Sequence, residues 1–268
     1  MKNLRHIFAL LFFWTSICCF DNAQMAIVVK HKGSPLWTPT GTILWLKNDS
    51  TTGAVGNGNP VATWYDQSGN SHDVTSSGTD RPTYETGILN GLPVVYFTAP
   101  NKMQSGSFTL NQPTTAFIVC NYVGIYSNDY WLDGLSLFTL ILGQYAATNT
   151  LGMYSGSWLS KTGNVLTSYG VFGGIYNGSS SLISFNGSTA TGNPGTGNAG
   201  GLTVGQAQNG NSPLTGGVGE IVIYNSAVST NLRTCIEGYL AWKWGLQADL
   251  PGGHAYASAA PTTGSNCT

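Results

Sequence analysis

The chain has 268 residues, a length at which a β-sandwich can form a single domain. Charged residues make up 8% of the sequence, well below the roughly 25% usual for soluble domains, and the formal net charge is −1. Because the sequence lacks the clusters of Lys and Arg that hold phosphates, its composition excludes nucleic acid as a partner.

Residues 1–24 have the pattern of a secretory signal peptide. Lys2 and Arg5 precede an apolar run at 7–13, and polar and small residues follow. The run is too short for a membrane span, which needs about 20 apolar residues. We therefore expect a secreted or surface-attached protein whose mature chain, 25–268, has no transmembrane span. A pair of adjacent cysteines in the leader leaves a lipid anchor as an alternative.

Strand-like runs recur along the mature chain, separated by turns rich in Gly, Asn and Ser. The runs are rich in β-branched and aromatic residues. In Thr115–Tyr122 the even-numbered residues face one way, and Phe117 and Val119 face the other. This pattern predicts an all-β fold, a two-sheet antiparallel jelly-roll sandwich. The predicted strands lie within 41–46, 92–98, 114–123, 137–143, 165–172, 181–187, 201–205 and 219–225.

The segment Thr189–Gly201 is rich in Gly, Asn and Thr and is expected to be a flexible loop between two late strands. It is too short to require a domain boundary.

One segment, Ser229–Leu246, predicts a helix instead, because its apolar residues recur at steps of three and four. Ser229 or Thr230 can cap its start, and Gly245 suits its end. Gly238, in the middle, costs roughly 1 kcal/mol against Ala, which indicates a close contact between helix and sheet. We expect this helix to pack over one edge or end of the sandwich.

The mature chain keeps three cysteines, Cys120, Cys235 and Cys267. An odd number allows one disulfide with one thiol left over, or three free thiols. No pair has the Cys-x-x-Cys spacing, and the histidines are few and scattered, so a zinc site is not expected.

Several stretches resemble a known superfamily. They are 61–84 with 91–103, the Asn-Gly hairpin at 182–192, and 216–246 with 250–261, whose helix ends in Lys-Trp-Gly. Together they resemble the concanavalin A-like lectin/glucanase superfamily, and within it the laminin-G-like jelly-roll domains of secreted bacterial and phage proteins. The resemblance implies that 25–268 form one domain of two antiparallel sheets. Proteins of this fold include lectins, adhesion modules, virion components and glycanases, so the fold does not decide the function.

Catalysis of glycan hydrolysis requires a pair of carboxyl groups about 5–9 Å apart. The glucanases of the superfamily place theirs on one strand as Glu-x-Asp-x-x-Glu, and this sequence contains no such pattern. We therefore expect a protein that is not an enzyme, although two acids from different loops could still converge.

The turn Ala62–Asn70 contains the first candidate site residue. Asp66 precedes Ser68 and Gly69, and a carboxylate at this place accepts backbone N–H groups in an Asx-turn. A metal site would need several more oxygen ligands, and Asp49, Asp73 and Asp80 lie at no familiar loop spacing. The structural role of the turn is therefore favoured. No cofactor is required, and calcium stays an alternative.

Two aromatic segments between predicted strands are the candidate ligand-binding site. Aromatic rings stack on the C–H faces of sugars, and carboxylates and amides bind their hydroxyls. The alternative is that Trp131 packs beneath its loop in a small satellite core. The candidates are Asn128, Asp129, Tyr130, Trp131 and Asp133 in a probable loop, and Tyr154 and Trp158 further on.

These observations favour a non-catalytic binding module that recognises a glycan or an extracellular protein. One alternative is a self-associating component of a surface layer, filament or virion, since low charge suits close packing between copies. Another is a glycosidase or polysaccharide lyase with an atypical pair of acids.

Overall fold

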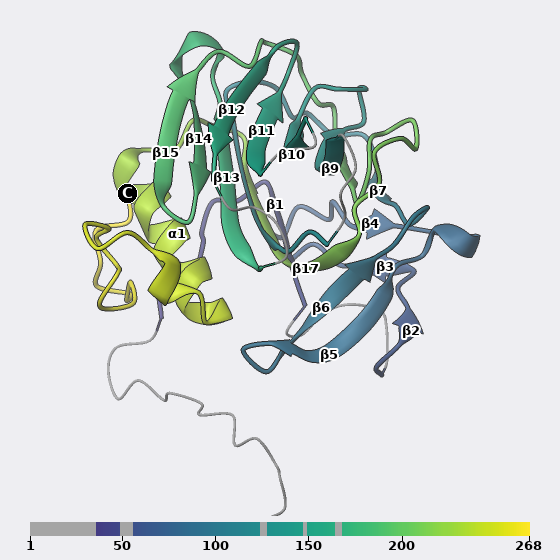
Figure 1. Ribbon diagram of the computed structural model, residues 1–268, viewed down its shortest axis with the longest axis horizontal. Coiled ribbons are helices and arrows are strands. Elements are labelled where there is room, and N and C mark those ends of the chain that lie inside the picture. Colours follow the sequence, from purple (N-terminus) through teal and green to yellow (C-terminus); the bar gives the residue numbers. More distant parts are fainter. Residues whose placement is uncertain (1–35, 49–55, 124–127, 147–148, 164–167) are drawn as a thin grey trace, which may run out of the picture. The chain divides into compact units, whose positions relative to one another are not determined.

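The computed structural model describes residues 36–48, 56–123, 128–146, 149–163 and 168–268. The predicted signal peptide, 1–24, lies outside these residues. The described chain folds into two antiparallel sheets that pack face to face, with one α-helix near the C-terminus (Figure 1). The predicted fold class is confirmed.

Within the described residues the first sheet has nine strands and the second has eight. The first sheet runs β15 (Ser188–Gly192), β14 (Ser181–Phe185), β13 (Gly170–Tyr176), β8 (Thr114–Cys120), β17 (Gly216–Tyr224), β6 (Leu92–Phe97), β5 (Thr83–Leu89), β2 (Asn59–Pro60), and β1 (Leu44–Lys47) also pairs with β17. The second sheet runs β12 (Trp158–Thr162), β11 (Thr150–Tyr154), β10 (Ile141–Tyr145), β9 (Asn128–Gly134), β16 (Leu202–Val204), β7 (Met103–Ser105), β4 (Val74–Thr75), β3 (Thr63–Trp64). The helices are α1 (Thr230–Trp244) and the short 3-10 helices η1 (Gly78–Asp80), η2 (Gly178–Ser180) and η3 (Gln247–Asp249).

Strand β8 lies in the middle of the first sheet and is buried on both faces. Ala116, Ile118 and Cys120 belong to the core between the sheets, whereas Phe117 and Val119 belong to a second apolar cluster shared with α1. The predicted alternation is therefore confirmed. Because both faces of the strand are covered, both sets of residues are apolar.

The Asn-Gly hairpin joins β14 to β15. Its two turn residues, Asn186 and Gly187, have φ angles of 46° and 79°, as the tightest hairpin turns require. Phe185 pairs with Ser188 across this turn, and pairing continues as far as Gly192. The expectation that Thr189–Gly201 is a loop throughout was wrong for its first residues, because the turn brings them into register with β14.

Helix α1 has the predicted caps. The Ser229 hydroxyl accepts the N–H of Leu232 at 3.1 Å, and Gly245 ends the helix with a left-handed φ of 74°. The helix packs against the face of the first sheet, over β6, β8, β13 and β17, rather than over an edge or end as expected. The reason is that these central strands carry apolar side chains such as Val222 on that outer face.

Glu220 of β17 anchors this helix. Its buried carboxylate accepts the indole N–H of Trp45 at 2.6 Å and that of Trp244 at 2.8 Å. The Tyr239 hydroxyl donates to it at 3.0 Å, and Lys243 Nζ lies 2.7 Å from Oε2. The Lys-Trp pair at the end of the helix thus supplies two of the four groups that neutralise or bind this carboxylate.

A disulfide ties the end of the chain to α1. It joins Cys235 of the helix to Cys267, and Cys120 is a buried free thiol. Of the two arrangements that the sequence allows, the structure has one bridge and one thiol. Burial raises the pKa of Cys120 well above its ordinary value.

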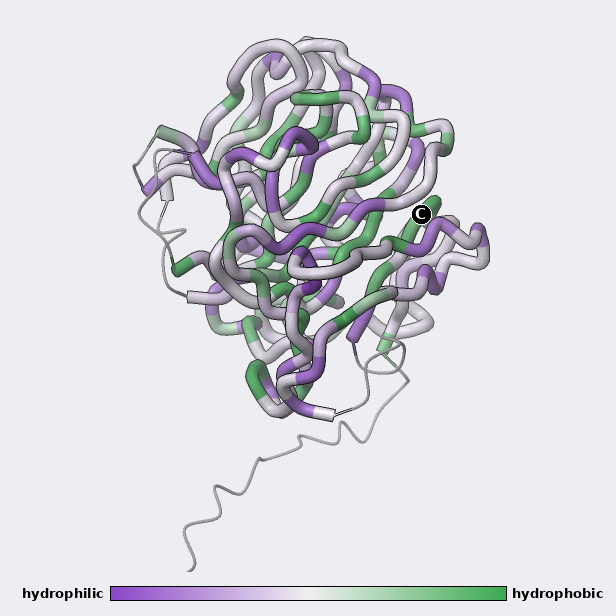
Figure 2. The backbone as a smooth tube through the Cα atoms, turned by 90° about the vertical axis from the view of Figure 1, so that its right-hand side faces the viewer, coloured by the Kyte–Doolittle hydropathy of each residue, from purple (hydrophilic) through white to green (hydrophobic). Residues whose placement is uncertain are grey.

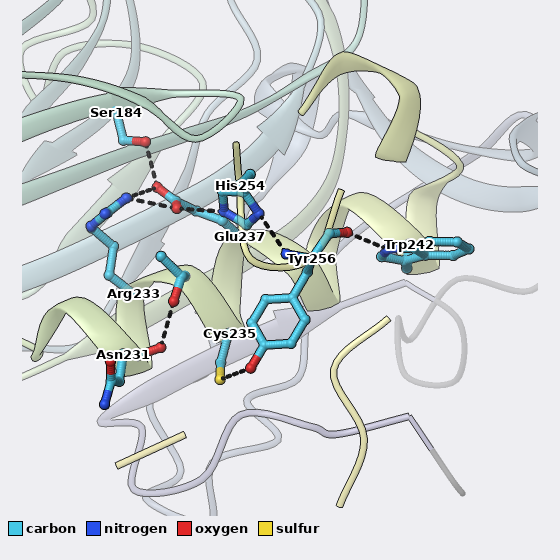
Figure 3. A network of polar contacts seen from close by, with 9 residues as sticks. Ser184, Asn231, Arg233, Cys235, Glu237, Trp242, His254 and Tyr256 are labelled. Carbon is cyan, nitrogen blue, oxygen red and sulfur yellow. Dashed lines mark hydrogen bonds and ion pairs between the residues drawn. The ribbon is translucent and has the colours of Figure 1, made fainter. Parts of the chain in front are cut away.

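Glu237, a buried carboxylate, also binds the C-terminal segment 250–268, which we call the tail, to the helix (Figure 3). Arg233 Nη1 lies 2.7 Å from each of its oxygens, and His254 Nε2 lies 3.1 Å from Oε2. The Ser184 hydroxyl of β14 donates to the same group at 2.5 Å. Helix, tail and sheet therefore meet at one ion-paired side chain.

The close contact at Gly238 is with the tail. A Cβ atom on Gly238 would lie 2.7 Å from Cβ of Tyr256 and 2.8 Å from two of its ring carbons. The Tyr256 carbonyl accepts the indole N–H of Trp242 at 2.8 Å, which holds the tail in this place (Figure 3). The expected contact between Gly238 and the sheet was therefore wrong.

Hydrophobic residues are distributed over many separate strands and over α1 (Figure 2). Among the residues that the structure describes, no helix has the length and apolarity to cross a bilayer.

Candidate binding site on the second sheet

The segment Asn128–Gly134, expected as a loop, is strand β9 (Figure 1). A register shift lies between β9 and β10, and it leaves Trp131 as the extra residue. Because of this bulge, Trp131 and Leu132 both enter the core between the sheets, while Tyr130 joins a small cluster on the outer face. The loop prediction was wrong because the bulge breaks the alternation that normally identifies a strand.

Two of the predicted ligand residues do not reach the surface. Trp131 has no exposed area, and its ring lies 4.5 Å from that of Phe172 between the sheets. It therefore belongs to the main core and not to a satellite. Asp129 is also fully buried; burial raises the pKa of its carboxyl group, and the Tyr122 side chain opposes that rise.

Two other predicted residues hold loops in place. Asn128 Oδ1 accepts the backbone N–H of Ala146 at 3.0 Å. Asp133 is fully buried and accepts four backbone N–H groups, at distances of 2.8–3.3 Å. Burial raises the pKa of Asp133, and these hydrogen bonds oppose the rise. The four donors are Gly134, Phe138, Thr139 and Gln208.

The three remaining candidates, Tyr130, Tyr154 and Trp158, meet on the outer face of the second sheet. Tyr154 and Trp158 are cross-strand partners, and their ring centroids lie 5.0 Å apart. Tyr130 lies 6.1 Å from Trp158. Two aromatic residues that the sequence analysis did not select complete the group: Tyr145 lies 4.5 Å from Trp158, and Phe138 lies 6.1 Å from Tyr130. We call these five residues the aromatic cluster.

Trp158 is the centre of the aromatic cluster, and its ring lies on the backbone of a neighbouring strand. A Cβ atom on Gly152 would come within 2.8 Å of Trp158 Cζ3 and of Tyr145 Cβ. Glycine at this position therefore leaves room for the indole. Trp158, Tyr145 and Tyr154 are half-buried, so their rings rest on the sheet and keep part of their surface in solvent.

The Tyr130 hydroxyl stays protonated and uncharged at neutral pH. Burial raises its pKa, and the nearby charge of Asp133 raises it further, although a hydrogen bond with Ser212 opposes the rise. Partly exposed rings beside a neutral hydroxyl suit an uncharged ligand that has both C–H faces and hydroxyl groups.

The turn at Asp66 has a different geometry. Asp66 Oδ1 accepts the N–H groups of Trp45 and Ser68, each at 2.9 Å. Its Oδ2 accepts the Ser68 hydroxyl at 2.7 Å and the N–H of His72 at 3.0 Å. Gly69, in the same turn, has a φ of 90°. All these contacts are made within the protein, and they connect β1 to the turn.

Among the described ranges, no group of three or more His, Cys, Asp or Glu side chains is placed to hold a metal ion.

The sequence matches no protein-family model and no curated protein. Solved structures share the β-sandwich. An arabinofuranosidase complexed with arabinofuranosyl-α-1,2-xylobiose is 13% identical with a TM-score of 0.55, over 77% of this chain and 60% of its own. A GH54 α-L-arabinofuranosidase soaked with 4-nitrophenyl α-L-arabinofuranoside is also 13% identical, with a TM-score of 0.54, over 76% and 60%.

A Trypanosoma rangeli sialidase in complex with sialic acid is 14% identical with a TM-score of 0.49, over 78% of this chain and 36% of its own. The chain thus spans about three fifths of the arabinofuranosidases and about a third of the sialidase. At these identities the likeness shows the fold alone.

Proposed function

We propose that this chain is an exported, non-catalytic carbohydrate-binding module, secreted or attached to the cell surface, that binds a glycan at the aromatic cluster. The observation that carries the proposal is the group of partly exposed rings around Trp158 on one open face of the second sheet. Rings that rest on a rigid sheet lose little conformational freedom when a sugar stacks on them.

Two further points favour a carbohydrate ligand. The arabinofuranosidases with a similar sandwich were solved with an arabinofuranoside and with arabinofuranosyl-α-1,2-xylobiose. The sequence also resembles the concanavalin A-like lectin/glucanase superfamily, which includes lectins. We propose that this chain belongs to the laminin-G-like branch of that superfamily.

The acids nearest to the aromatic cluster along β9 favour binding over catalysis. Glycoside hydrolysis needs two carboxyl groups that both reach the scissile bond. Asp129 is fully buried and bonds to Tyr122 of the core, and Asp133 is buried beneath the loops whose backbone it binds. Neither carboxylate is open to a sugar on the outer face.

Titration calorimetry with neutral oligosaccharides, namely the xylo-, manno- and cello- series, tests the proposal. A pair of aromatic side chains contributes about 0.5–1.5 kcal/mol beyond area burial. If a sugar face stacked on the indole contributes a similar amount, Trp158→Ala should weaken binding about 2- to 12-fold. Trp158→Phe keeps a ring and should lose less. Tyr65, which is 45% exposed and lies outside the cluster, provides the control variant Tyr65→Ala.

The proposal would be wrong if the wild-type chain bound none of these series. It would also be wrong if Trp158→Ala, with an unchanged melting temperature, bound as tightly as Tyr65→Ala.

A further inference from the structure

A hollow of about 630 Å³ lies at the end of the sandwich where η2 faces the loop 193–198. A Cβ atom on Gly178 of η2 would lie 3.7 Å from Thr196 of the loop, so the two segments are near neighbours. The hollow is lined by amide and hydroxyl side chains together with a proline and a glycine, and none of the lining side chains is charged.

Gln112 fixes the walls of this hollow. Its Nε2 donates to the Ser155 hydroxyl at 3.0 Å and to the carbonyls of Gly195 and Gly197 at 3.1 Å. Its Oε1 accepts the N–H of Gly178 at 3.0 Å. One side chain therefore connects η2, the loop and the β11–β12 turn.

Two asparagines present hydrogen-bond donors to the hollow. Asn193 Oδ1 accepts the N–H of Gly195 at 2.9 Å, and Asn198 Oδ1 accepts the N–H of Gln112 at 3.0 Å. These bonds fix the orientation of each amide, so that its Nδ2 group can donate to a ligand, and each oxygen keeps a second lone pair. Ser179 is exposed on the facing segment and adds a hydroxyl.

A loop that lines the hollow is hydrogen-bonded to the turn that joins two residues of the aromatic cluster. The turn between Tyr154 and Trp158 contains Ser155 and Ser157, whose N–H groups both donate to the Pro194 carbonyl, at 2.7 and 2.8 Å. The Ser157 hydroxyl donates to the Asn193 carbonyl at 2.7 Å. Consequently the loop that forms one wall of the hollow is bound to the turn that carries two rings of the cluster.

We infer that this amide-lined hollow is a second subsite, for an uncharged sugar unit, so that the ligand is a neutral oligosaccharide that contacts both the hollow and the aromatic cluster. The inference rests on the proposed function. Amide N–H groups and hydroxyls bind sugar hydroxyls, and a lining without Lys or Arg gives no compensation for a carboxylate or sulfate.

The test measures affinity against chain length. Di- to hexasaccharides of the xylo-, manno- and cello- series are titrated into the wild-type chain and into Ser179→Trp, which fills the hollow. Thr196→Tyr fills it from the loop side. Ser258→Trp adds the same ring at an exposed position of the tail and serves as the control.

Wild-type affinity should rise with chain length by about tenfold, the gain expected from one or two net hydrogen bonds. Both filling variants should abolish this rise and leave the disaccharide affinity unchanged, whereas Ser258→Trp should behave as wild type. Oligogalacturonides of matched length should bind more weakly than the neutral series.

Binding that both filling variants leave unchanged at every length would overturn the second subsite and leave the proposed function intact. Tighter binding of oligogalacturonides would overturn the neutral ligand class. A wild-type chain that binds no oligosaccharide would overturn the proposed function itself and the subsite with it.

Discussion

Because of the contact between Gly238 and Tyr256, the effect of Gly238→Ala on the free energy of unfolding should change sign when the tail contact is removed. In an isolated helix, Gly→Ala stabilises by about 1 kcal/mol. In this protein the new methyl would lie 2.7 Å from Tyr256 Cβ, closer than such atoms approach, and overpacking of this kind costs about 1–3 kcal/mol. Gly238→Ala should therefore lower the free energy of unfolding by up to about 2 kcal/mol.

The same substitution should stabilise the protein when Tyr256 is removed. Tyr256→Gly deletes both the Cβ atom and the ring, so the helix propensity of Ala at Gly238 is no longer opposed. In that background Gly238→Ala should raise the free energy of unfolding by about 1 kcal/mol. The losses that Tyr256→Gly causes by itself, including its hydroxyl contact with the disulfide, are common to both arms and cancel.

Urea unfolding of the four proteins, with the disulfide intact, measures this cycle. The coupling energy should be about 1–3 kcal/mol, with opposite signs for Gly238→Ala in the two backgrounds. If Gly238→Ala stabilised the protein equally with and without Tyr256, the close approach of the tail would be refuted.

Three further predictions concern carboxylates. Glu220→Gln leaves Lys243 with a broken ion pair in a buried place and should cost about 3–5 kcal/mol in urea unfolding, whereas the exposed Asp249→Asn should change stability by less than about 0.5 kcal/mol. Asp66→Ala removes an acceptor of four hydrogen bonds, so it should lower the free energy of unfolding by about 2–4 kcal/mol and lower the melting temperature. Loss of glycan binding with an unchanged melting temperature would contradict this structural role. Burial raises the pKa of Asp129 above its ordinary 3.8, so its stability contribution is fully present below about pH 3.8 and is lost as pH rises through the raised value. Asp129→Asn should therefore stabilise the protein at pH 7 and lose that advantage at about pH 3; an equal gain at both pH values would contradict the burial of a charge.

The candidate site could be predicted only in part. The sequence analysis could identify Tyr154 and Trp158 as candidates because they are two aromatic residues close together in a segment otherwise rich in Gly and Ser. Tyr145 and Phe138 were not, because they reach the same place from β10 and from a loop. Strand periodicity could have indicated Tyr145. It is four residues from Ile141, so the two lie on the same face of β10, and Ile141 packs in the cluster that contains Tyr130.

The sequence alone determined the features that depend on neighbouring residues. Alternation in Thr115–Tyr122 defined both faces of a strand, and Ser229 and Gly245 defined the ends of the helix. The hairpin at Asn186–Gly187 was indicated by the family resemblance, whereas the composition of Thr189–Gly201 indicated a loop from its first residue. Each of these signals acts within one or two turns of backbone, where local sterics and hydrogen bonds are sufficient.

Tertiary structure alone decided which distant residues meet. The bulge in β9 turned Trp131 into the core and left Tyr130 on the outer face, so two adjacent aromatic residues have different surroundings. The partner of Gly238 proved to be Tyr256, and the partner of Cys235 proved to be Cys267. Such pairings depend on the packing of segments far apart in sequence, about which local residue patterns carry no information.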